Sequence, residues 1–165
     1  MKKPFIGVIG FANAGKSSII GSIAGNRTIS YRGTIEDIET KQNIYVIGAS
    51  PQKYDFQEKE YHSIMKSMMK KKDCRGVICS IQPTNARKRM SMEAMFAIAK
   101  KFDYELYAYV VDPPAEPAEK KRISDVAEFV KGKLTPFDVS LKVLSGQVFP
   151  YRNAQVIQKD TNIIG

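Results

Sequence analysis

Residues 10–17 read Gly10-Phe11-Ala12-Asn13-Ala14-Gly15-Lys16-Ser17, which is the pattern G-x-x-x-x-G-K-S. The stretch follows an apolar run, 5–9, and precedes a periodic segment, 18–24, so it connects a predicted strand to a predicted helix. Glycines let the backbone approach a ligand, and the N–H groups at a helix N-terminus attract anions. The pattern therefore predicts a loop that binds the phosphates of a nucleotide.

Two side chains of this loop carry the expected chemistry. Lys16 is predicted to reach the terminal phosphates, where it would also assist catalysis, and the Ser17 hydroxyl to take one coordination position on Mg²⁺. The ligand is predicted to be GTP or ATP together with Mg²⁺. The other expected contacts to the nucleotide from this loop are Gly10, Asn13, Ala14, Gly15 and Ser18.

The length of 165 residues fits one domain with a sizeable core. We expect residues 1–150 to form the nucleotide-binding domain and 151–165 to be a C-terminal tail of that domain, as a short strand, a docked arm or a disordered segment. The apolar runs are too short for a membrane span or a signal peptide, which predicts a cytoplasmic protein. Cys74 and Cys79 are expected to be buried free thiols, which suits a reducing compartment.

A net charge of +9 raises the question of a nucleic-acid partner. Many of the lysines fall near the predicted end of a helix, where positive charge favours the helix dipole and solubility. The run Arg87-Lys88-Arg89 is different, because three cations at a predicted helix start oppose the dipole. Nucleic-acid binding is thus a possibility that the charge allows but does not favour.

Strands and helices alternate along most of the chain. The uninterrupted apolar strands predict a mostly parallel sheet with helices on both faces, an α/β fold of three layers. The predicted strands are 5–9, 44–47, 76–81, 105–111 and 140–144, with a short alternating segment at 34–40. The predicted helices are 16–24, 56–71, 85–101 and 117–131. Ligands of such sheets bind beyond the carboxyl ends of the strands, where 10–17, 48–52, 112–114 and 145–147 are expected to lie.

The loop resembles the first motif of the translation-factor-like and Obg-like GTPases, which carry an asparagine at the position of Asn13. Residues 34–37 look like the first switch of Ras-like GTPases, so the resemblance implies that Thr34 closes over Mg²⁺ and the terminal phosphate. Ser145-Gly146-Gln147 is similar to the loop that contacts the base in that family, which implies a role for Ser145. The chain is thus expected to be a P-loop NTPase resembling the small GTPases.

Two motifs of that family are degenerate. After strand 44–47 the chain reads Gly48-Ala49-Ser50-Pro51-Gln52, without the aspartate and glycine of the Asp-x-x-Gly (Walker B) motif. Gln52 lies roughly where Ras-like enzymes keep the glutamine that positions water, which makes it a candidate catalytic residue. The guanine-specificity motif Asn-Lys-x-Asp is replaced by Asp112-Pro113-Pro114-Ala115, where Asp112 or Glu116 could substitute for its aspartate.

These residues leave three hypotheses open. The first is a degenerate GTPase-like switch that hydrolyses GTP or ATP slowly or not at all, and whose protein partner binds residues 27–40. The second is a small nucleotide or nucleoside kinase, with Arg87, Lys88 and Arg89 as a clamp. The third is an interaction protein that has kept the fold and lost nucleotide binding.

Overall fold

The computed structural model describes residues 2–11, 15–23, 32–36, 41–48, 58–84, 90–112, 117–146 and 148–163, with only the backbone of 112 and 117–125. In this part of the chain one six-stranded sheet has the strand order β2-β3-β4-β1-β5-β6. Its strands are β1 Pro4–Ile9, β2 Arg32–Glu36, β3 Asn43–Ile47, β4 Cys74–Ile81, β5 Glu105–Asp112 and β6 Ser140–Ser145. β2 is antiparallel to β3, and the other pairings are parallel.

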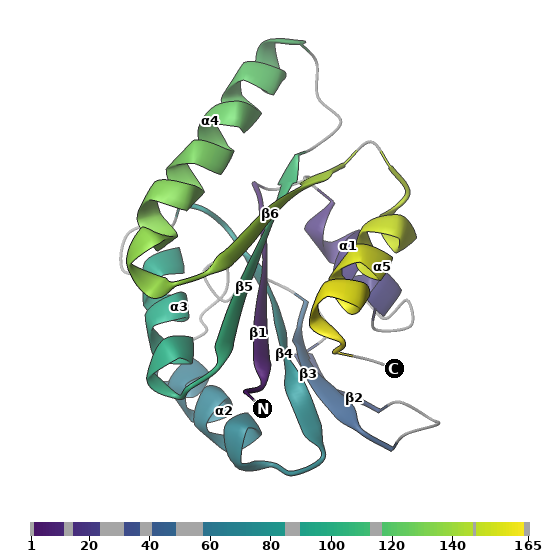
Figure 1. Ribbon diagram of the computed structural model, residues 1–165, viewed down its shortest axis with the longest axis vertical. Helices are drawn as coiled ribbons and strands as arrows, with labels where there is room; N and C mark the ends of the chain where they lie inside the picture. The colour runs from purple at the N-terminus through teal and green to yellow at the C-terminus, as the bar shows by residue number, and fades with distance from the viewer. Residues whose placement is uncertain are drawn as a thin grey trace.

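Helices cover both faces of this sheet. Figure 1 shows α1 and α5 on one face and α2, α3 and α4 on the other. Their bounds are α1 Lys16–Ile23, α2 Glu58–Lys70, α3 Met92–Lys101, α4 Pro117–Leu134 and α5 Pro150–Thr161, and a 3-10 turn, η1, spans Thr135–Phe137. The structure confirms the predicted α/β fold of three layers with a mostly parallel sheet.

Alternating side chains of the strands pack into two separate cores, one on each face of the sheet. In β1, Phe5 and Ile9 pack on the side of α2 and α3, while Ile6 and Val8 pack on the side of α1 and α5. Successive residues of a strand point to opposite faces, so a strand covered on both faces needs apolar residues at every position. This requirement explains why β1 reads as an unbroken apolar run.

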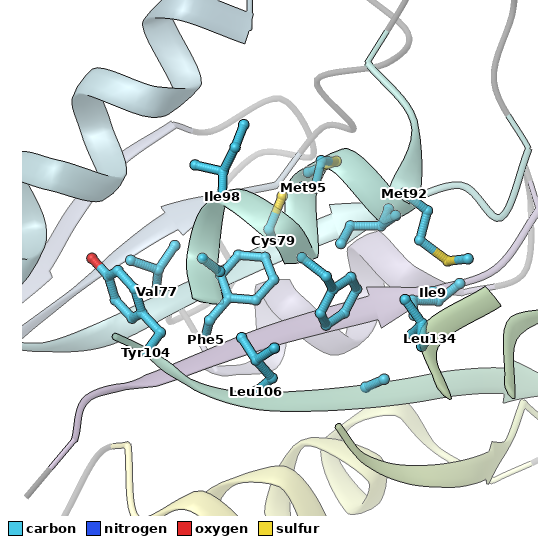
Figure 2. Close-up of a cluster of buried hydrophobic side chains, with 14 of the residues drawn as sticks. Phe5, Ile9, Val77, Cys79, Met92, Met95, Ile98, Tyr104, Leu106 and Leu134 are labelled. Carbon is cyan, nitrogen blue, oxygen red and sulfur yellow. The ribbon is translucent and has the colours of Figure 1, made fainter. Parts of the chain in front are cut away.

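Phe5 lies at the centre of the larger core, which Figure 2 shows in part. Its ring meets Phe96 edge-on, with 5.2 Å between the ring centroids and 90° between the planes. Tyr61 and Tyr104 also meet Phe5 edge-on, each with 6.5 Å between centroids. Edge-to-face pairs of this kind add stability beyond the apolar area that they bury.

Two buried tyrosines connect α2 and α3 in opposite directions. The Tyr61 hydroxyl, on α2, donates to the Met95 carbonyl on α3 at 2.9 Å, and the Tyr104 hydroxyl, just after α3, donates to the Met65 carbonyl on α2 at 2.7 Å. Burial raises the pKa of both phenols, because the charged form loses its hydration. Both hydroxyls therefore stay protonated donors in the folded chain.

β1 and α3 are close enough to exclude a side chain at Gly7. A Cβ there would lie 2.7 Å from Cζ of Phe96 and 2.9 Å from Cδ1 of Ile81. Real Cβ atoms do not approach other atoms so closely, so this position requires glycine for space. Packing thereby explains why a glycine stands within the apolar run of β1.

Positive charge gathers at the edge where the parallel strands begin, opposite the loop 10–17. Lys3 donates to the carbonyls of Met68 and Lys71 at 2.7 and 2.6 Å, which satisfies groups at the C-terminus of α2. Other lysines at this edge are exposed: Lys2, Lys41, Lys70, Lys71, Lys72, Lys100 and Lys101. Cys74 is the first residue of β4 and Cys79 lies within it, and both are buried free thiols, as the sequence predicted.

Two helices differ from the sequence-based expectations. Helix α3 begins at Met92 and not at residue 85, because Ser91 caps it: the Ser91 hydroxyl accepts the Ala94 N–H at 3.1 Å. The tail 151–165 was expected as a strand, an arm or a disordered segment, and most of it forms α5. Ala154 and Ile157 are buried there in the core shared with α1, while residues 164–165 lie outside the described residues.

Candidate functional site

The predicted phosphate loop lies at the carboxyl end of β1. Gly10 follows the last residue of β1, and its N–H donates to the Ile81 carbonyl at the end of β4, 3.1 Å away. The loop therefore starts at Gly10, where the neighbouring parallel strands β1 and β4 both end. The chain returns with Gly15 and enters α1 at Lys16, whereas Asn13 and Ala14 lie outside the described residues.

Gly15 turns the chain into α1. Its φ is +97°, in a region that other residues rarely adopt, and its carbonyl accepts the first helical hydrogen bond, from Ile19 at 3.2 Å. Among the described residues, no atom lies within 4 Å of the position that a Cβ would take. Glycine is therefore needed here for backbone conformation and not for space.

Lys16 is the most informative side chain of the site. Its residue is only 7% exposed, and its ammonium donates to the carbonyls of Gly10 and, at 3.2 Å, Phe11. Lys16 therefore connects the last part of the loop, where α1 begins, to the first two residues of the loop. A buried ammonium beside the N–H groups of a helix start is suited to bind a phosphate group.

Two hydroxyls follow Lys16 in the first turn of α1. Ser17 is partly exposed and Ser18 is exposed, so solvent can reach both residues. The Ser18 carbonyl accepts the Ser22 hydroxyl at 3.0 Å, as is common within helices. Ser17 thus stands next to Lys16 at the position expected of an Mg²⁺ ligand. Hydroxyl oxygen suits Mg²⁺, which prefers oxygen ligands.

The structure brings together the two residues predicted to contact the base. Asp112 and Ser145 are paired at the carboxyl ends of β5 and β6, the two strands next to β1 on one side. The Ser145 carbonyl accepts the side-chain N–H of Asn153 on α5 at 2.8 Å. Both residues therefore lie at the same edge of the sheet as the loop.

Thr34 is not brought to the loop. It lies in the middle of β2 opposite Tyr45, which is in register with Val77 and through it with Phe5. Phe5 is four residues before the end of β1, about 13 Å along the strand. β2 is also the outermost strand on the far side of β3 and β4. Gln52 and most of 27–40 lie outside the described residues.

Sequence reasoning missed the residues at the start of α5. Asn153 is 5% exposed and binds the Ser145 carbonyl, while Phe149 and Tyr151 beside it are exposed. Pro150 is the sequence signal for this helix start, because proline is favoured in the first turn of a helix. In the described part of the chain no three His, Cys, Asp or Glu side chains are grouped so as to hold a metal ion.

The strand, glycine turn, buried lysine and serine define a P-loop nucleotide-binding protein. The chain matches the family described as 50S ribosome-binding GTPase over residues 5–142, and it belongs to that family. The protein is thus a GTP-binding P-loop protein. A comparison with curated proteins finds no match. Among the described residues, none of the helices has both the length and the apolar character that crossing a membrane requires.

Proposed function

We propose that the protein binds GTP with Mg²⁺, hydrolyses it slowly or not at all, and serves as a nucleotide-dependent interaction module. The observation that carries this proposal is the buried Lys16 ammonium, held by loop carbonyls where α1 begins. A phosphate oxygen entering the loop would meet this cation and the backbone N–H groups of the first helical turn.

Slow hydrolysis is inferred from the residues after β3. Gly48-Ala49-Ser50-Pro51-Gln52 contains no carboxylate to support Mg²⁺ binding. Mg²⁺, when bound, would neutralise charge on the phosphates, and Ser17 is the residue that we propose to hold it. We leave Thr34 out of this metal site because its register places it in the middle of β2, level with Phe5 and not with the loop. Gln52 remains the candidate for positioning water.

The interaction module is proposed to act through 27–40, the segment that includes β2. Binding of a terminal phosphate would order the part of this segment nearest the loop and so prepare it for a protein partner. Arg32, which starts β2, is paired with Ile47 at the end of β3, so β2 begins at the ligand edge of the sheet. The two buried free cysteines agree with a cytoplasmic location, which stays part of the proposal.

The family description also names a partner, the 50S ribosome. We extend the proposal to an RNA-containing partner that meets the exposed lysines where the parallel strands begin. Lys70 ends α2 there, and Lys71 and Lys72 follow it in the turn before β4. The double charge reversal Lys70→Glu/Lys72→Glu should weaken binding to RNA and reduce its salt dependence. Lys131→Glu on α4, exposed elsewhere, is the control.

Hydrogen exchange with and without GTP and Mg²⁺ tests the switch. The proposal expects slower exchange in 10–23 and 27–40 when GTP is present, and no change in Lys16→Ala. Slower exchange in 10–23 alone would show that the protein binds GTP but that 27–40 does not respond as a switch. Identical exchange throughout, together with no heat on titration, would favour the hypothesis of a scaffold that has lost nucleotide binding.

A kinase remains the second candidate chemistry. Arg87, Lys88 and Arg89, its proposed clamp, lie outside the described residues. Incubation with GTP or ATP and a panel of nucleosides and nucleotides, followed by product detection, separates the two. Transfer to any acceptor would replace the switch proposal, and release of phosphate alone would favour a GTPase.

A further inference from the structure

Large apolar side chains are exposed just after β6. Val148, Phe149 and Tyr151 are 38%, 68% and 50% exposed. The rings of Phe149 and Tyr151 are stacked, with 5.9 Å between their centroids and 19° between their planes. Single exposed apolar residues are common on protein surfaces, but a stacked aromatic pair held out into solvent marks a binding surface.

The pair is fixed in place by the fold. The Asn153 side chain ties the first turn of α5 to the Ser145 carbonyl at 2.8 Å, and the Arg152 N–H donates to the Phe149 carbonyl at 2.9 Å. At the other end of α5, Asp160 accepts the Tyr109 hydroxyl at 3.0 Å and the Lys142 ammonium at 2.8 Å. α5 is thus held to the sheet at both ends, and its aromatic start cannot swing away freely.

The pair also lies where a nucleoside would extend from the loop. β5 and β6 are the first and second neighbours of β1, so their ends lie about 5 and 10 Å to one side of Gly10. α5 starts at this same edge and packs beside α1, whose first turn would bind the phosphates. A nucleotide with its phosphates in the loop and its base toward β6 would reach the start of α5.

We propose that Phe149 and Tyr151 form a platform on which the purine base of the bound nucleotide stacks. This inference rests on the proposed nucleotide binding by the loop. It gives the base a source of affinity in a chain that lacks the Asn-Lys-x-Asp motif. Aromatic stacking accepts every base, because each has a π face, so the platform adds affinity for GTP and ATP alike.

The test compares ligands with and without a base. Calorimetry in the presence of Mg²⁺ measures the affinities of GTP, ATP and inorganic tripolyphosphate for the wild type, Phe149→Ala and Phe149→Ala/Tyr151→Ala. Loss of stacking should weaken GTP and ATP by about 10- to 100-fold in the double variant and leave tripolyphosphate unchanged. Phe129→Ala is the matched control, since Phe129 is an exposed aromatic residue (41%) on α4.

Conservative variants separate stacking from apolar contact. Phe149→Trp should keep the affinity for GTP and Phe149→Leu should lose it. The chain has no tryptophan, so the indole of Phe149→Trp is a single reporter whose fluorescence GTP should quench and tripolyphosphate should not. Equal quenching by both ligands would contradict a base on the platform.

Other outcomes are distinguishable. If the wild type binds GTP no more tightly than tripolyphosphate, the platform is wrong while binding by the loop stands. If the wild type binds none of the three ligands, the proposed function fails and the platform fails with it. If the double variant keeps its GTP affinity but sediments as a smaller species than the wild type, the pair is a contact between two copies of the chain, and the proposal is overturned.

Discussion

Asp112 and Ser145 face each other in register at the last paired position of β5 and β6. Val110 on β5 is in turn paired with Ile9, the residue before the loop glycine. This register places the two residues that the sequence predicted for the base beside the loop that it predicted for the phosphates. The proposed base side of the site would therefore be formed by neighbouring strand ends, although the sequence of the usual guanine motif is absent.

We predict that Asp112→Asn lowers the preference for GTP over ATP. A carboxylate that accepts hydrogen bonds from guanine contributes charge-assisted bonds. Its loss should therefore lower the affinity for GTP by about 10- to 100-fold and change the affinity for ATP little. Competition between GTP and ATP for a fluorescent nucleotide measures the ratio. Asp138→Asn is the control, because Asp138 is exposed and has φ +53°, a conformation that asparagine also tolerates. An unchanged ratio would assign no role in base selection to Asp112.

Lys16→Ala should reduce GTP affinity by more than about 100-fold. The variant removes the buried cation that contacts the start of the loop and leaves the carbonyls of Gly10 and Phe11 without this donor. Calorimetric titration measures the affinity, and thermal unfolding verifies that the variant is folded. Binding of GTP by a folded variant as tightly as by the wild type would refute the assignment of the site.

Ser17→Ala should make nucleotide binding insensitive to Mg²⁺, because its hydroxyl is the proposed ligand of the ion. The measurement is GTP affinity with Mg²⁺ and with EDTA. Ser22→Ala serves as the control within the same helix, since the Ser22 hydroxyl is bonded to the Ser18 carbonyl and lies one turn further from the loop. A Mg²⁺ effect that persists in Ser17→Ala and equals that of Ser22→Ala would move the metal site elsewhere.

Three glycine-to-alanine variants should change the free energy of unfolding in different directions. Gly7→Ala should destabilise the protein by about 1–3 kcal/mol, because the new methyl group overlaps Phe96 and Ile81. Gly15→Ala should cost about 1–2 kcal/mol from backbone strain alone, since φ is +97° and the space is open. Gly132→Ala in α4 should stabilise by about 0.5–1 kcal/mol. Urea unfolding followed by circular dichroism gives all three values.

Stability should fall steeply in alkaline solution. Burial raises the pKa of Tyr61, Tyr104 and Tyr109 above the value of about 10 for an exposed tyrosine. A raised pKa in the folded state means that these phenols favour folding fully below pH 10 and that this contribution is lost progressively as the pH rises above 10. Urea midpoints between pH 8 and 11 should show the loss. Tyr104→Phe should flatten the alkaline slope.

The layers of the fold could be predicted because they depend on local signals. The apolar run of β1, the glycines of the loop and the periodic apolar residues of α2 each identify one element, and strand–helix alternation then favours a parallel sheet. Lys16 and Ser17 could be identified for the same reason, since their roles follow from a contiguous motif. Each of these signals is contained in a short, continuous stretch of sequence.

The remaining features depend on pairing between distant segments. Thr34 matched the spacing of a switch residue, but the register of β2 against β3 sets its height in the sheet, and spacing alone does not determine register. The role of Asn153 depends on the packing of α5 against the end of β6, because its side chain donates to the Ser145 carbonyl there. Helix α5 itself has few apolar residues, because it buries only one narrow side that includes Ala154 and Ile157.

The reciprocal tyrosine bonds limit where a nucleotide-driven motion can travel. Sliding α2 past α3 would leave the Met95 and Met65 carbonyls without their donors in a dry core, at a cost of about 1–3 kcal/mol for each group. These two hydrogen bonds therefore oppose any sliding of α2 relative to α3. Any mechanical response to the nucleotide has its easier route on the opposite side of the sheet, where α1 leads directly from the loop to its neighbour α5.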